Sequence, residues 1–145
     1  MKKFLFLLLI VFLVSLLASG CSNDKGSDDV DVDLTALSKT VAQAEFQNIL
    51  SNADDYLGKT IKVNGQYYSL FVDRTGNYHH FVIVVPGDEC CMMGFEFKLS
   101  GDHVYPDDYP AQNVMIEVTG TFERYNENGN SNLHLADSDM TVLGE

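Results

Sequence analysis

The sequence has few positively charged residues. It contains 9 Lys and Arg against 21 Asp and Glu, and two of the basic residues, Lys2 and Lys3, lie in the first 20 positions, so the rest of the chain carries a net charge of 7 − 21 = −14. Nucleic-acid binding takes most of its affinity from Lys and Arg that neutralise phosphates, and anionic membrane surfaces likewise attract basic patches. The composition therefore disfavours nucleic acid and anionic lipid surfaces as partners and favours cations or cationic ligands.

Cysteine is also scarce. The chain has three cysteines, Cys21, Cys90 and Cys91, and the last two are neighbours. Adjacent Cα atoms lie about 3.8 Å apart across a trans peptide, whereas ordinary disulfides need roughly 4.4 to 6.8 Å. An unstrained disulfide between Cys90 and Cys91 is therefore excluded, and two neighbouring thiols need another explanation.

Catalytic signatures are absent from the sequence. There is no Gly-x-Ser-x-Gly nucleophile elbow, no phosphate-binding glycine loop and no His-Glu-x-x-His zinc helix. No internal repeat is visible either. We therefore expect a single domain that is not an enzyme.

The N-terminus has the layout of an export signal. Two lysines precede an apolar run over residues 4–17, which ends at Ala18-Ser19-Gly20-Cys21. This ending resembles the lipobox of bacterial lipoproteins, in which the cysteine is diacylated before cleavage. The resemblance implies that residues 1–20 are removed and that Cys21 becomes a lipidated N-terminus in the bilayer, which holds the protein on the extracytoplasmic face of the cell membrane. A transmembrane anchor and a signal peptide cut without lipidation stay open as alternatives.

The rest of the chain divides into a tether and a domain. Residues 21–37 are polar and acidic and predict a flexible tether, and residues 38–145 form the domain. A helix is expected over residues 38–56, with Ser38 as its N-cap. Its apolar stripe is expected to contain Val41, Ala44, Phe46, Ile49, Leu50 and Ala53.

Five strands are expected after the helix, because apolar and polar residues alternate between turn signals. They span residues 60–72, 78–85, 95–99, 114–122 and 133–135. Five short strands with one helix suit a small barrel better than a two-sheet sandwich, which usually needs about seven strands.

Several short segments resemble a family of uncharacterised Gram-positive lipoproteins. They are Tyr56–Gly65, Cys90-Cys91, Gly94–Phe97, Gly101-Asp102-His103, Tyr105–Pro110 and Val118–Phe122. The resemblance covers residues 38–143 and implies a five-stranded OB-like barrel with no established activity. Tyr67, Tyr68, Phe71 and Tyr78 could stack bases, but the acidic charge argues against that role, and strand aromatics more often pack in a core.

The residues best suited to chemistry are thiols and imidazoles, the usual ligands of zinc. We expect Cys90, Cys91 and His103 to bind zinc or copper(I), with His80 or His79 as the fourth ligand. Successive strand side chains face opposite ways, so His79 and His80 cannot both point at one centre. Two alternatives are a strained, redox-active Cys90-Cys91 disulfide and thiols without a role. The rival function is a non-catalytic module that binds an envelope protein or a small ligand.

Overall fold

The structure is a computed structural model that describes residues 29–84 and 93–144. The described chain is mainly β, with one α-helix, as the sequence predicts. In order, its elements are β1 (Val32–Asp33), α2 (Lys39–Ser51), a 3-10 turn (Ala53–Asp55), β2 (Thr60–Val72), β3 (Asn77–Val84), β4 (Met93–Leu99), β5 (Met115–Glu127) and β6 (Asn130–Val142). None of the helices in these residues is long and apolar enough to cross a membrane.

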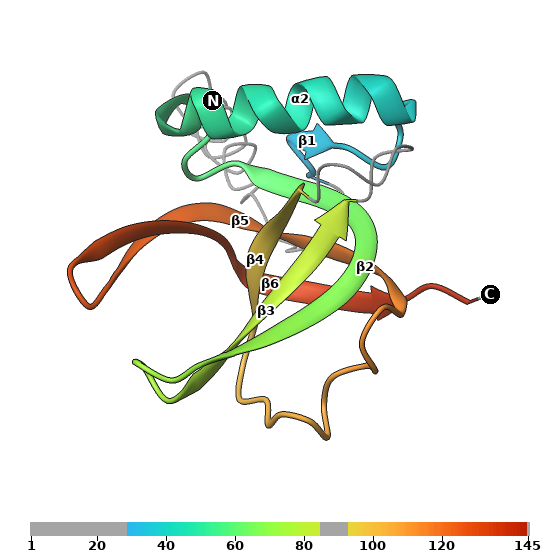
Figure 1. Ribbon diagram of the computed structural model, residues 1–145. Coiled ribbons are helices and arrows are strands. Elements are labelled where there is room, and N and C mark those ends of the chain that lie inside the picture. Colours follow the sequence, from blue (N-terminus) through green and yellow to red (C-terminus); the bar gives the residue numbers. More distant parts are fainter. Residues whose placement is uncertain (1–28, 85–92, 145) are drawn as a thin grey trace, which may run out of the picture.

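The strands form one mixed sheet that closes on itself. Their order is β1-β2-β3-β4-β6-β5, and a further pairing of β2 with β5 joins the five long strands into a ring. Pairing within the ring is antiparallel except between β4 and β6, which run parallel. Five strands were expected after the helix, and the structure adds the two-residue β1 as a sixth at the edge of β2. Figure 1 shows α2 lying across the upper side of this ring.

The core lies inside the ring because alternate side chains of each long strand point inward. In β4, for example, Phe95, Phe97 and Leu99 are buried while Glu96 and Lys98 face outward. The same alternation buries Ile61 and Val63 of β2. The helix closes one end of this core by burying Ala42, Phe46 and Ile49, and the Phe46 ring packs 4.6 Å from the ring of Phe95.

The helix confirms part of the expected apolar stripe. It begins after Ser38, although the Ser38 side chain makes no capping hydrogen bond, and it ends at Ser51 rather than residue 56. Phe46 and Ile49 are buried as expected, but Val41 and Leu50 are 51% and 45% exposed. The expected stripe also included Ala44, which is exposed, and left out Ala42, which is buried.

The segment before the helix differs from the expected tether. Val32 and Asp33 pair in parallel with Ile61 and Lys62 of β2, and Leu34 is buried in the core. Asp31 already bonds to Thr60, through both its backbone N–H and its side chain. Residues 31–37 are therefore part of the domain, because one leucine among the acidic residues finds an apolar site. Residues 21–28 lie outside the described residues.

The last two strands are much longer than the sequence indicated. β5 and β6 stay paired from Ile116–Val142 to Glu127–Asn130, with a turn at Asn128 and Gly129. In β6 only Leu133 to Leu135 showed a clear apolar pattern, because polar residues dominate the strand on both sides of this segment. In Figure 1 the hairpin arches away from the ring on the left.

Candidate functional site

An open pocket of about 690 Å³ lies where β3 and β4 separate. Their pairing runs from Val84–Met93 to His80–Phe97 and stops there, so residues 77–79 and 98–99 diverge. The β5–β6 hairpin and the loop after β4 complete the walls. Most lining side chains are rings, and we call this site the aromatic pocket; its rings are Tyr78, His79, His80, Phe97, His103, Tyr105, Tyr109, Tyr125 and His134.

The loop that follows β4 is held against the pocket by its own contacts. Near its end, the Gln112 side-chain amide accepts a hydrogen bond from the Ser69 backbone N–H and donates one to the Ser69 carbonyl, each at 3.1 Å. Earlier in the loop, the Tyr105 ring lies 4.2 Å from the ring of Tyr78, and the Tyr109 ring stacks 3.8 Å from that of His80. These two ring contacts, one tilted and one stacked, hold the loop against the pocket.

His80 forms the floor of the pocket and belongs to the core. It is 9% exposed, and its Nδ1 lies 2.7 Å from the hydroxyl of Tyr67. Burial, with a smaller contribution from His79, lowers the pKa of His80 to about 4. Burial also raises the pKa of Tyr67 to about 12. We therefore assign a neutral imidazole at pH 7 that accepts the Tyr67 proton at Nδ1.

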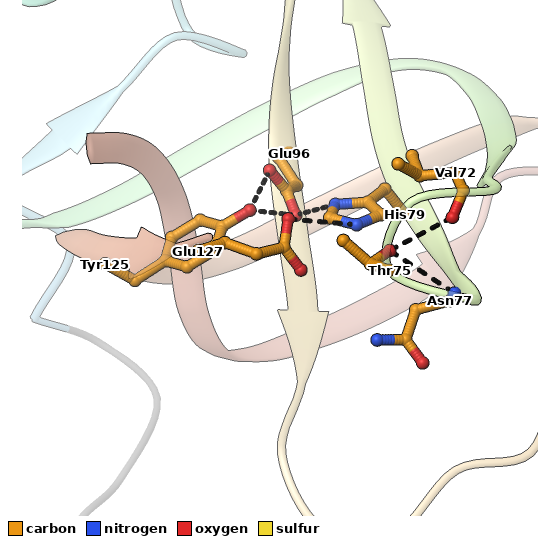
Figure 2. Close-up of polar contacts among 7 residues, drawn as sticks. All are labelled: Val72, Thr75, Asn77, His79, Glu96, Tyr125 and Glu127. Carbon is orange, nitrogen blue, oxygen red and sulfur yellow. Dashed lines mark hydrogen bonds and ion pairs between the residues drawn. The ribbon is translucent and has the colours of Figure 1, made fainter. Parts of the chain in front are cut away.

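His79 points the opposite way, as strand alternation requires. Its Nδ1 lies 2.7 Å from Glu96 Oε1, and its Nε2 lies 3.4 Å from Glu127 Oε2. The Tyr125 hydroxyl lies 2.8 and 2.7 Å from the two oxygens of Glu96 and donates its proton to that carboxylate. Figure 2 shows the His79 ring facing the carboxylates of Glu96 and Glu127, with Tyr125 on the far side of Glu96.

This network joins strands that are distant in the sequence. His79 comes from β3, Glu96 from β4, and Tyr125 and Glu127 from β5. All are sheltered, since the side chains of His79, Glu96 and Glu127 are only 11%, 18% and 25% exposed. Burial and the hydrogen bond to Glu96 raise the pKa of Tyr125, which keeps its hydroxyl protonated as a donor.

The three candidate metal-binding histidines, His79, His80 and His103, have separate partners among the described residues. All three line the aromatic pocket, but each has its own partners. The His103 Nε2 donates to the Ser100 carbonyl at 2.9 Å, and its Nδ1 lies 3.8 Å from Asp108. Within residues 29–84 and 93–144, no three side chains of His, Cys, Asp or Glu are placed to hold one metal ion.

Cys21, Cys90 and Cys91 lie outside the described residues, so their predicted roles stay predictions. The residues that flank the segment containing both thiols, Val84 and Met93, pair with each other. His103 follows the opposite end of β4, and the seven residues from Met93 to Leu99 span about 20 Å of strand.

The expected aromatic face divides between core and surface. Tyr67 is fully buried, whereas Tyr68, Phe71 and Tyr78 are about half exposed, and of these only Tyr78 lines the pocket. Sequence reasoning missed Glu127 and Tyr125, because the strand containing them showed no apolar pattern there. The sequence did indicate one member of the network, because Glu96 lies between two inward-facing phenylalanines and must therefore face outward.

No protein-family model matches the chain, and no curated protein gives a significant match.

Proposed function

We propose that this protein is a membrane-anchored, extracytoplasmic lipoprotein with an OB-like barrel that binds a small sugar-containing ligand in the aromatic pocket. The role is binding rather than catalysis. The observation that carries the proposal is the pocket itself, an open site with tyrosine rings and two carboxylates between two hairpins.

The strand connections support the OB-like assignment. In an OB fold, five strands form a partly open Greek-key barrel, and ligands bind on the second and third strands between two hairpin loops. Here the ring order β2-β3-β4-β6-β5, with its single parallel pair β4–β6, makes β3 and β4 the second and third strands. The aromatic pocket lies on those two strands, between the β2–β3 and β5–β6 hairpins.

The chemistry of the walls selects among the ligands of such folds, which are oligonucleotides and oligosaccharides. A net charge of −14 after residue 20 opposes a polyanion. Tyr78 and Tyr105 offer flat apolar faces, while Glu96 and Glu127 can accept hydrogen bonds from hydroxyl or amine groups. We therefore propose a neutral or amine-bearing oligosaccharide.

Titration calorimetry of the chain from Ser22 onward tests this proposal with two probes. They are the tetrasaccharide of N-acetylglucosamine and its deacetylated, positively charged counterpart. We expect at least one to bind, and Tyr78→Ala or Tyr105→Ala to weaken binding about tenfold or more, which corresponds to about 1.4 kcal/mol. The reason is that each variant removes one of two tyrosine rings that contact each other at the pocket wall.

Tyr68→Ala is the matched control. Tyr68 is a similarly exposed tyrosine on β2 that does not line the pocket, so its loss should leave the affinity unchanged. The proposal fails if neither saccharide binds, or if Tyr68→Ala weakens binding as much as the pocket variants.

Lipid attachment is tested by changing Cys21. We expect the parent protein to fractionate with membranes after export and Cys21→Ala to be released, because each buried methylene of an acyl chain contributes about 0.8 kcal/mol. Metabolic labelling with a fatty acid gives the direct readout. A Cys21→Ala protein that stays membrane-bound and labelled would contradict the lipid anchor.

Metal binding at Cys90 and Cys91 stays a second proposal. Neighbouring thiols suit zinc or copper(I), and Met93, close by in sequence, is partly buried beside Gln47. About one equivalent of metal in protein purified without chelator, absent when both cysteines are serine, would support it.

A further inference from the structure

The partners of His79 indicate which of its ring nitrogens carries the hydrogen. Its Nδ1 lies 2.7 Å from Glu96, whose two oxygens also accept the hydroxyl proton of Tyr125. A carboxylate accepts hydrogen bonds only, so Nδ1 carries the proton that bonds to Glu96. In the neutral ring, Nε2 then has a free lone pair.

That nitrogen is the one buried polar side-chain atom without a hydrogen bond among the described residues. Glu127 Oε2 lies 3.4 Å away, close enough for an ion pair, but the contact lacks hydrogen-bond geometry. A neutral Nε2 and a carboxylate oxygen are both acceptors, so neither can satisfy the other. Leaving a buried group unpaired costs about 1 to 3 kcal/mol, and such groups call for an explanation.

A metal ion between the two atoms would satisfy both. Zinc binds imidazole nitrogen and carboxylate oxygen at about 2.0 to 2.2 Å in tetrahedral geometry, which places neighbouring ligand atoms about 3.3 to 3.5 Å apart. The observed separation of Nε2 and Oε2 is 3.4 Å. Octahedral magnesium, with bonds of about 2.1 Å, would bring neighbouring ligands to about 3.0 Å. We propose that His79 and Glu127 bind a tetrahedral divalent metal ion, with Zn²⁺ as the preferred ion.

The surroundings match those of metal-binding histidines. Such a histidine usually donates its other ring N–H to a carboxylate, which fixes the ring and raises its basicity. Glu96 has this role here, and Tyr125 in turn holds Glu96, as Figure 2 shows. The described residues supply two ligands, so the other two positions are open to water or to a ligand in the aromatic pocket. This inference does not depend on the sugar proposal.

Zinc titration by calorimetry tests the site in the chain from Ser22 onward, with Cys90 and Cys91 both changed to serine so that thiol binding cannot contribute. We expect one zinc per chain, and at least a tenfold loss of affinity in His79→Gln and in Glu127→Gln. Glu96→Gln should weaken binding about 10- to 100-fold, because it removes the carboxylate behind the ligand. Glu117→Gln, which changes a carboxylate that pairs with Lys62 outside the pocket, should bind like the parent.

Cobalt(II) gives a readout that a purely structural role would not change. We expect the parent to develop the intense visible absorption of tetrahedral cobalt and His79→Gln to lack it, while circular dichroism shows that both are folded. The proposal is overturned if His79→Gln binds zinc as tightly as the parent, or if Glu117→Gln abolishes binding. It is also overturned if nitrogen NMR shows His79 protonated on both ring nitrogens with saturating zinc present.

Discussion

Phe46→Ala is expected to lower the free energy of unfolding by about 3 to 5 kcal/mol, the usual range for a buried phenylalanine. Phe46 is 1% exposed and is the largest side chain that α2 places in the core. Its ring packs 4.6 Å from that of Phe95, so truncation opens a cavity where the helix meets the ring of strands. Urea unfolding followed by circular dichroism measures the loss.

Leu50→Ala is the matched control on the same helix. Leu50 is 45% exposed, so its truncation should change the free energy of unfolding by less than about 0.5 kcal/mol. Comparable losses in the two variants would mean that α2 packs through a different face from the one described.

The helix shows what sequence can and cannot determine. The inward position of Phe46 follows from periodicity, which is a local property. Val41 and Leu50 were assigned wrongly because a helix with apolar residues on most sides does not specify which stripe is covered. That choice depends on the position of Phe95, about 50 residues later in the chain.

The candidate site depended even more on distant pairings. Strand alternation correctly sent His79 and His80 to opposite faces. What His79 meets there was not predictable, since Glu96 and Glu127 reach it through the β3–β4 pairing and an unrecognised part of the β5–β6 hairpin. Which residues face each other on neighbouring strands depends on the whole ring. The local sequence shows only that side chains alternate between the two faces of a strand.

Lowering the pH from about 6.5 to 4 is expected to reduce the free energy of unfolding by about 3 kcal/mol through His80 alone. Burial lowers the pKa of His80 to about 4 from an ordinary value of 6.5. The unfolded chain therefore takes up the proton first, and stability that is complete above pH 6.5 is lost as the pH falls through 4. The groups around the ring, Tyr67, Tyr105, Tyr109 and His79, offer no carboxylate to compensate the charge.

His80→Asn isolates this contribution. Asparagine does not titrate, and its side-chain oxygen can still accept the hydrogen bond from Tyr67. Urea unfolding of both proteins is measured at pH 7 and pH 4 in the presence of a chelator. The carboxylates are the same in both proteins, so their contribution cancels when the two losses of stability are compared. The asparagine variant should lose about 3 kcal/mol less than the parent. Equal losses would show that His80 is not buried as a neutral ring.

If Cys21 carries a lipid, as we propose, the short pairing of β1 with β2 limits how far the domain can stand from the bilayer. Because Asp31 is already bonded to Thr60, only ten peptide links separate it from Cys21. A fully extended chain covers at most about 3.3 to 3.6 Å per residue, so the tether from Cys21 to Asp31 is no longer than about 35 Å. A tether that ran to Ser38 would reach about 60 Å. With a lipid on Cys21, the domain would stay within about 35 Å of the bilayer. It would therefore meet only those ligands that reach the membrane surface.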